Sequence, residues 1–393
     1  MDGIYLDNGA TTPLDPKVEE KMKEFWQDNF GNPSSVHTLG RRARDVVEES
    51  RKTIAKSVNA KTHEIYFTSG GTESNNWVIK GIAFALRKKG KHIITTKIEH
   101  KCILESCRWL EGLGYEITYL DVDEGGFVDE EKLKEAIRRD TVLVSIIHGN
   151  NEIGTIQDIK RFGKLCRDLG VYFHTDACQS YTKVPIDVKD MCVDLMTLNA
   201  HKIHGPKGVG ALYIHDGVEI HPLLHGGGQE KGKRSGTSNV PGIVGFAEAV
   251  RLGLDKRHVE YMKKLRDKLG RRLLDLEETE LNGPSLENVD ERLCNNLNIM
   301  FRGVDNEVLG SVLDARGVYV SAGSACSARS TKPSHVLLAI GRTEDEARNS
   351  IRITLSRFNT EDEIDRAGEI IEEEVRKIRG GIINKITRLF KGS

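Results

Sequence analysis

Short apolar runs alternate with longer amphipathic stretches along the chain from about residue 64. The apolar runs are rich in β-branched residues and have the length of buried strands, over 64–69, 92–97, 116–122, 141–148, 171–175, 193–198 and 209–215. Most of them are separated by stretches with helical spacing, over 73–88, 101–113, 129–138 and 159–169. This alternation is typical of βαβ units. We therefore predict an α/β fold, with a mainly parallel, doubly wound sheet in a large domain over residues 16–253.

The pattern changes in the last third of the chain. Residues 251–274 hold nine basic and three acidic residues with apolar positions at helical spacing, which predicts one long solvated helix between two domains. The strand-like segments 296–301 and 351–355 and the helix-like segments 304–315 and 361–379 follow. They predict a small α+β domain, made of residues 1–15 and 254–379.

A basic tail, residues 380–393, follows the predicted small domain. From Arg376 to Ser393 the chain has six Lys or Arg residues, no acidic residue, and several interspersed apolar side chains. Two interpretations stay open: a frayed, solvated tail, which we favour, and an amphipathic docking segment.

Composition argues against several classes of protein. The 393 residues include 58 Lys plus Arg against 59 Asp plus Glu, and a net charge of -1 argues against a dedicated nucleic-acid binder. No apolar run approaches the roughly 18 residues that span a bilayer, and the first residues lack a secretory pattern. We therefore expect a cytoplasmic protein without a membrane partner.

The seven cysteines are scattered and never spaced C-x-x-C. Their spacing therefore predicts neither a disulfide framework nor a zinc ribbon, and most are expected to be buried, reduced thiols. Two histidine pairs, at 201 and 204 and at 221 and 225, lack the carboxylates or thiolates of a catalytic zinc site. We predict no metal site.

The candidate chemistry follows the strands. In open parallel sheets, ligands bind beyond the carboxyl ends of the strands. The run 64–69 leads into Ser69-Gly70-Gly71-Thr72-Glu73, a glycine turn that opens a helix; such a turn either binds phosphate or is an ordinary helix start. Four other strand ends carry one residue each of interest: His100, Asn151, Asp176 and Lys202.

Each of these residues alone has an ordinary structural explanation, as a surface histidine, a helix cap or a solvent-facing lysine. Together, a lysine, an aspartate and a phosphate-binding turn such as 69–73 (the anion cup) are the groups that pyridoxal phosphate requires. Lys202 offers the amine for a Schiff base, and Asp176 offers the carboxylate that keeps the pyridine nitrogen protonated. His100, one strand over, is placed to stack on the ring and exchange protons.

Cys326 differs from the other six cysteines. It lies in residues 321–330, a run of small and polar residues that predicts a loop rather than a packed element. Arg329 and Lys332 favour its thiolate, which is the nucleophilic form. This environment fits either a cysteine without a chemical role or a cysteine that acts as a nucleophile.

The motifs resemble those of one enzyme family in the same order. They stand at 5–12, 30–37, 68–76, 99–101, 150–154, 176–179, 201–202, 234–237 and 323–327. Over nearly the whole chain, to about residue 375, the sequence resembles the cysteine desulfurases of the NifS/IscS-like group, which are fold-type-I pyridoxal-phosphate enzymes of the class-V aminotransferases. The length of the loop around Cys326 resembles the group whose loop carries sulfur to an acceptor.

The resemblance assigns roles to individual residues. It implies that Lys202 bonds to the coenzyme, that Asp176 pairs with the pyridinium, that Gln179 binds the phenolic oxygen, and that Asn151 and Arg352 bind the substrate carboxylate. The implied coenzyme-binding residues are Gly71, Thr72, His100, Asn151, Asp176, Gln179, Asn199, His201, Lys202 and, from a second subunit of a homodimer, Thr237. The chain departs from the family at position 199, where Asn stands in place of the usual Ser.

The implied reaction converts L-cysteine to L-alanine. Its catalytic residues are Lys202, His100 and Cys326, with the sulfur left as a persulfide on Cys326. A sulfur-acceptor protein, such as a scaffold or a thiolation enzyme, then receives the sulfur for iron–sulfur clusters or for thiolation of tRNA or a cofactor. The alternatives are a selenocysteine lyase or another β-elimination enzyme with pyridoxal phosphate, and a non-catalytic sulfur-trafficking scaffold.

Overall fold

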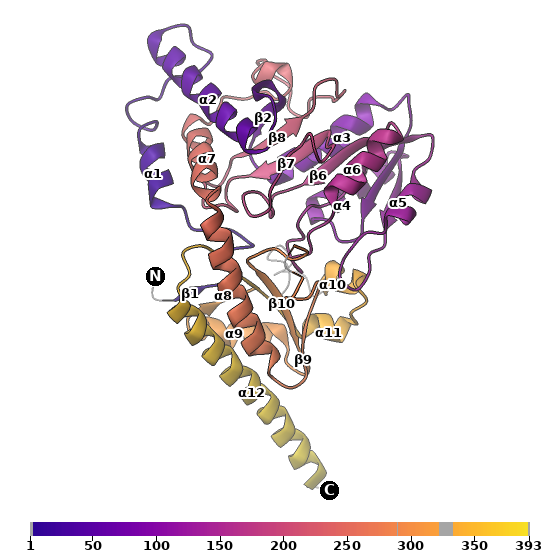
Figure 1. Cartoon of the computed structure of the whole chain (residues 1–393), viewed down its shortest axis with the longest axis vertical. Helices are drawn as coiled ribbons and strands as arrows, with labels where there is room; N and C mark the ends of the chain where they lie inside the picture. Colours follow the sequence, from indigo (N-terminus) through magenta and orange to yellow (C-terminus); the bar gives the residue numbers. More distant parts are fainter. Residues whose placement is uncertain (1–2, 289, 322–332, 392–393) are drawn as a thin grey trace.

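The structure is a computed structural model, and it describes residues 3–288, 290–321 and 333–391, with side chains as far as residue 381. Figure 1 shows two parts: one surrounds the large sheet, and the other lies around α8, β10 and α12. The two ends of the chain lie in this second part, where α12 runs out to the C-terminus.

The large sheet has seven strands in the order β2-β8-β7-β6-β5-β3-β4. Their bounds are β2 (Ile65–Thr68), β3 (His92–Thr96), β4 (Glu116–Leu120), β5 (Thr141–Ser145), β6 (Tyr172–Asp176), β7 (Leu195–Asn199) and β8 (Gly210–Ile214). Only β8 runs antiparallel to its neighbours in this sheet. The predicted α/β fold with a mainly parallel sheet is therefore confirmed.

Helices cover both faces of this sheet. One face carries α3 (Gly71–Ala85) and α4 (Lys101–Glu111); the other carries α1 (Pro16–Lys23), α2 (Thr38–Ser57), α5 (Glu130–Ala136), α6 (Ile159–Asp168) and α7 (Val240–Gly253). The alternation within β2 shows why both faces are apolar. Ile65 and Phe67 pack in one core, while Tyr66 packs in the other with Trp77 of α3.

The second part is built on a three-stranded antiparallel sheet with the order β12-β10-β9. Its strands are β9 (Thr279–Leu281), β10 (Asn296–Phe301) and β12 (Ser350–Thr354), and a parallel pair joins β1 (Ile4–Tyr5) to β11 (Val318–Tyr319). Its helices are α8 (Lys256–Leu274), α9 (Asn306–Ala315), α10 (His335–Ala339), α11 (Glu344–Arg348) and α12 (Glu361–Lys391). Two short 3-10 turns, η1 (Thr62–Glu64) and η2 (Glu230–Gly232), lie near the large sheet.

The second part has a core of its own. Ile4 and Leu6 from the start of the chain pack there with Leu269, Ile299 and Ile371. The domain limits given above, 16–253 against 1–15 with 254–379, stay a prediction. Within the described residues, no helix combines the length and the apolar content needed to cross a bilayer.

Two predicted elements differ from the structure. The single helix expected over 251–274 is instead two helices, because α7 ends at Gly253 and α8 begins at Lys256. Asp255 lies between them with extended backbone and accepts a hydrogen bond from the Arg257 backbone N–H, which is the geometry of an N-cap. The tail expected to be frayed from residue 380 is helical as far as Lys391; it contains no proline, and it continues a helix that begins at Glu361.

The loop that follows β5 is fastened to the second part by buried side chains. The Arg292 guanidinium donates to the carbonyl oxygens of Asn282 at 2.6 Å, Pro284 at 2.7 Å and Ile153 at 2.9 Å. The Asn296 amide donates to the Glu152 carbonyl at 3.1 Å. The bonds to Ile153 and Glu152 cross between the two parts, so they hold the segment that contains Asn151.

We expect Arg292→Met to lower the free energy of unfolding by at least about 3 kcal/mol, because each buried carbonyl left without a donor costs about 1–3 kcal/mol. The measurement is the midpoint of urea unfolding. Arg302→Met is the matched control: the Arg302 side chain is 50% exposed, its ion pairs measure 3.4 and 3.5 Å, and its loss should change stability by less than about 0.5 kcal/mol. Equal shifts in the two variants would contradict the role given to Arg292.

Candidate active site

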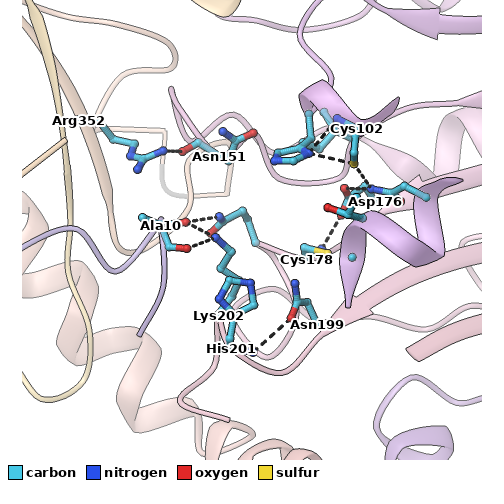
Figure 2. A pocket seen from close by; sticks show the side chains of 16 residues that line it. Ala10, Cys102, Asn151, Asp176, Cys178, Asn199, His201, Lys202 and Arg352 are labelled. Carbon is cyan, nitrogen blue, oxygen red and sulfur yellow. Dashed lines mark hydrogen bonds between the residues drawn. The ribbon is translucent and has the colours of Figure 1, made fainter. Parts of the chain in front are cut away.

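A cavity of about 220 Å³ lies beyond the carboxyl ends of the parallel strands, and Arg352 of β12 reaches it from the second sheet (Figure 2). Its lining consists of Gly9, Ala10, Gly71, Thr72, Asn75, His100, Cys102, Ile147, Asn151, Asp176, Cys178, Gln179, Asn199, His201, Lys202 and Arg352. The structure thus brings together all the candidate residues named from the sequence except Thr237 and Cys326. The Thr237 of this same chain is exposed and does not line the cavity. Cys326 lies outside the described residues.

The local fold explains this convergence. Asp176 and Asn199 are the last residues of β6 and β7, and Gly71 starts α3 directly after β2. His100 is the N-cap of α4, which follows β3. Because these strands are parallel, their carboxyl ends meet at one edge of the sheet, and the side chains that follow them face a common space.

Lys202 follows β7 and points at the first loop of the chain. Its Nζ donates to the carbonyl oxygens of Gly9 and Ala10, both at 2.6 Å (Figure 2). Burial, with a further contribution from the Arg352 guanidinium, lowers the pKa of Lys202 to about 8. About a tenth of the amine is therefore neutral at pH 7 and about half at pH 8, far more than for an ordinary lysine, and the neutral amine is the form that attacks an aldehyde.

Asp176 is buried and held from two sides. The Cys178 backbone N–H donates to its Oδ1 at 2.9 Å, and the Asn75 amide donates to its Oδ2 at 2.7 Å. These donors orient the carboxylate in the wall of the cavity. Such an oriented carboxylate suits a protonated heterocyclic nitrogen.

His100 lies in the same wall. Its Nδ1 caps α4 by accepting from the Cys102 backbone N–H at 3.2 Å. Burial lowers the pKa of His100. A neutral imidazole at this position can cover the face of a flat ligand and exchange a proton with it.

An anion cup adjoins the cavity at the start of α3. Gly71, Thr72, Asn199, His201 and Lys207 line it. A Cβ atom at Gly71 would lie 2.8 Å from the Cys178 sulfur and 3.3 Å from the Asn199 amide, so glycine alone fits there. The free N–H groups of a helix start, together with Lys207, favour a phosphate.

Glu73, which also lines the cup, is paired with the segment that leads to Thr237. Arg234 forms a two-bond ion pair with Glu73 in the first turn of α3, at 2.7 and 2.9 Å. His201 is held by Thr11, with 3.1 Å between Nδ1 and the hydroxyl oxygen. Burial and the charges of Lys202 and Lys207 lower the pKa of His201 to about 3, so its imidazole stays neutral beside the cup.

Arg352 crosses the opposite side of the cavity and is only 2% exposed. Its Nη2 pairs with Asp7 at 2.8 Å, and its Nη1 donates to the Asn151 carbonyl at 3.2 Å. Its Nε is buried without a hydrogen-bond partner, as are the Oδ1 atoms of Asn75 and Asn151. Buried polar atoms normally have partners, so these three atoms of the lining indicate a polar ligand.

Pyridoxal phosphate fits this set of residues. An enclosed amine, an oriented carboxylate, a cup with helix-start N–H groups and unpaired polar atoms all border one cavity. Lys202 would hold its aldehyde carbon, Asp176 its ring nitrogen, and the Gly71 turn its phosphate.

The chain enters and leaves the Cys326 segment beside this cavity. Ser321 and Arg352 exchange two backbone hydrogen bonds, at 3.1 and 2.8 Å. On the other side of the segment, the Ser334 hydroxyl donates to the Glu152 carboxylate, next to Asn151. The residues that flank the segment are therefore hydrogen-bonded to Arg352 and to Glu152, which is next to Asn151. Arg352 and Asn151 are the two side chains expected to bind the substrate carboxylate.

Sequence reasoning assigned no role to six residues of the lining, Gly9, Ala10, Asn75, Cys102, Ile147 and Cys178, nor to Asp7, the partner of Arg352. Of the six cysteines expected to be buried, Cys107, Cys166, Cys178 and Cys294 are buried, and Cys102 and Cys192 are half-buried. The cavity lining, which was not expected for any of them, includes Cys102 and Cys178. A positional signal existed, because they stand two residues after His100 and Asp176, and Asn75 stands one helical turn after Gly71. Among the residues with described side chains, no cluster suited to a metal ion is found.

The lowered pKa of Lys202 predicts how the coenzyme-free protein takes up pyridoxal phosphate. The rate of covalent uptake should rise with pH up to about 8 and then level off, because the neutral fraction of the amine saturates above its pKa. An ordinary lysine would drive a rise that continues to about pH 10.4. The measurement is the absorbance change on mixing across a pH series, and a rise that continues past pH 9.5 would contradict the assignment.

Known proteins match the chain over nearly its whole length. The aminotransferase class-V family model matches residues 4–367. Cysteine desulfurase IscS of Methanosarcina thermophila is 49% identical over 378 residues, which is 96% of this chain and 93% of that protein. Cysteine desulfurase IscS of Dictyoglomus turgidum is 50% identical over 379 residues, which is 96% of this chain and 95% of that protein.

Solved structures agree with these matches. A NifS-like protein superposes with a TM-score of 0.89 at 40% identity, covering 95% of this chain and 99% of the other. The structure described as SspA in complex with cysteine has a TM-score of 0.81 at 39% identity, covering 91% and 99%. The chain therefore belongs to the class-V aminotransferase family and, within it, to the cysteine desulfurases.

Proposed function

We propose that this cysteine desulfurase binds L-cysteine in the cavity at Lys202, releases L-alanine, and places the sulfur on Cys326. The observation that carries the proposal is the meeting of the Lys202 amine, the Asp176 carboxylate and the Gly71 cup around one cavity. The desulfurases similar to this chain over nearly its full length support the substrate and the products.

When bound, pyridoxal phosphate supplies an electron sink for the bond that breaks at the substrate Cα. The protein's own groups position the substrate and move its protons. Arg352 offers its guanidinium to the substrate carboxylate, and Asn151, whose side-chain N–H groups can donate to the same carboxylate, lines the cavity with it. Lys202, once its amine is free, removes the Cα proton, and His100 exchanges protons on the face that it covers.

The sulfur step needs a thiolate from the segment that begins after Ser321. In our proposal the Cys326 thiolate attacks the substrate sulfur and an S–S bond forms. The bond between that sulfur and the substrate Cβ breaks, its electron pair stays with Cβ, and a proton converts Cβ to the methyl group of alanine. The Cys326 sulfur is thereby oxidised to a persulfide while Cβ is reduced, so no outside oxidant is required.

We further propose a homodimer in which Thr237 of a second copy completes the anion cup. The support is that Thr237 is exposed and does not line the cup of its own chain. The persulfide then passes to an acceptor protein for iron–sulfur cluster assembly or thiolation. A thiol that must stay reduced favours the cytoplasm.

One experiment tests the reaction and the site together. The coenzyme-loaded protein is mixed with L-cysteine, alkylated without reductant, and digested, and alanine is counted against the mass of each of the seven cysteine peptides. We expect one alanine for each added sulfur on the Cys326 peptide. Alanine without that adduct, or an adduct on another cysteine, would refute the assignment of Cys326, and the absence of alanine would refute the reaction.

A further inference from the structure

Four side chains form a continuous hydrogen-bonded row in the wall of the cavity. The Asn75 amide donates to Asp176 at 2.7 Å and to the Cys102 sulfur at 3.2 Å, and the Cys102 sulfur lies 2.9 Å from Nδ1 of His100. Figure 2 shows Cys102 and Asp176 on the same side of the cavity, with these bonds drawn. The row connects the carboxylate proposed for the coenzyme nitrogen to the imidazole proposed for its ring face.

The donors in this row can be assigned. The amide nitrogen of Asn75 has two hydrogens, one for Asp176 and one for the Cys102 sulfur. Burial raises the pKa of Cys102 to about 12, so it remains a thiol with one hydrogen to give. The Nδ1 atom of His100 already accepts from the Cys102 backbone N–H at 3.2 Å, which makes it an acceptor for the thiol as well.

We infer that Cys102 is a positioning residue for His100: its S–H donates to Nδ1, holds the imidazole as the Nε2–H tautomer, and connects it through Asn75 to Asp176. The inference rests on the proposed role of His100 and adds residues that act through it. A proton on Nδ1 would prevent the Cys102 S–H from donating to that nitrogen. The row therefore favours a neutral His100 ring whose N–H is on Nε2, the nitrogen away from α4.

The row also gives a reason for thiol chemistry at position 102. The second Asn75 hydrogen needs an acceptor, and Nδ1 lies close enough to the side chain at 102 to take a donor from it beside the backbone N–H, so one side chain must accept from Asn75 and donate to His100. A thiol or a hydroxyl meets both demands, whereas alanine meets neither. Cys107 is a natural control, because it lies on the same helix, is fully buried, and packs in the core rather than in the cavity wall.

The experiment uses the coenzyme-loaded protein and its Cys102→Ala, Cys102→Ser, Cys107→Ala and His100→Ala variants. Infrared difference spectra report each S–H stretch, and ¹⁵N spectra of labelled histidine report the tautomer. We expect a lowered, broadened S–H band that vanishes in Cys102→Ala, persists in Cys107→Ala, and moves to the frequency of a weakly bonded thiol in His100→Ala. The Nδ1 signal of His100 should move toward that of a more weakly hydrogen-bonded nitrogen in Cys102→Ala, because only the backbone N–H still donates to it, and should be restored in Cys102→Ser.

Turnover gives a second readout. In Cys102→Ala, kcat for alanine should fall about tenfold with little change in KM, and Cys102→Ser should recover most of it. An S–H band of Cys102 at the weakly bonded frequency in the unsubstituted protein, or an unchanged Nδ1 signal of His100 in Cys102→Ala, would overturn the inference. Neither result touches the desulfurase proposal, which fails instead if the unsubstituted protein forms no alanine.

Discussion

Lys202→Ala is expected to lower the rate of alanine formation by at least about a thousandfold. The substitution removes both the amine that bonds to the coenzyme and the base that takes the Cα proton, and a well-placed acid or base alone contributes about 10²–10⁴-fold. Gly9 and Ala10 also lose the donor that their carbonyls share. The measurement is alanine production under saturating L-cysteine and added pyridoxal phosphate.

A trapping experiment shows which lysine carries the coenzyme. Burial lowers the pKa of Lys183, as it does that of Lys202, to about 8. The Lys183 amine, however, donates to the carbonyls of Gln179 and Lys202 and lies outside the cavity lining. Borohydride reduction followed by peptide mapping should therefore place the adduct on Lys202, and an adduct on Lys183 would contradict the assignment.

Cys326→Ala is expected to abolish persulfide formation and to lower the rate of alanine formation by roughly a hundredfold or more, because no other group is proposed to take the sulfur. Binding of L-cysteine and exchange of its Cα proton should persist, since Lys202, His100 and Arg352 are unchanged. The measurements are alanine, protein-bound sulfur, and deuterium incorporation at Cα in heavy water.

Cys192→Ala is the matched control for this substitution. Cys192 is a free, half-buried thiol that lies between β6 and β7 and outside the cavity lining. It should retain full activity. Undiminished release of sulfide by Cys326→Ala would favour a β-elimination or selenocysteine lyase, and a protein that stays colourless with added pyridoxal phosphate would favour a scaffold without catalysis.

Much of the fold was predictable because its signals are local. The seven strands of the large sheet lie within a few residues of their predicted positions, since short β-branched runs bounded by helices have few other structures. The prediction failed for residues 251–274, where one helix-capping residue has more effect than the helical spacing around it. Asp255 interrupts the helical pattern of 251–274 by capping a new helix.

The candidate site was predictable in part for a topological reason. His100, Asp176 and Lys202 each follow a strand of one parallel sheet, so their convergence follows from strand order. Cys102 and Asn75 could not be assigned in this way. They project from helices, and only the packing of α3 against α4 places the Asn75 amide between Cys102 and Asp176.

The sequence by itself determined the succession of strands and helices, the family motifs and the residue types of the chemistry, because these depend on neighbours along the chain. The tertiary structure alone decided how distant segments meet. It places Arg352 of β12 between Asp7 and Asn151, and it turns Cys102 from an expected core thiol into a partner of His100. Such contacts join residues far apart in the chain or on different elements, and no local pattern encodes the packing that brings them together.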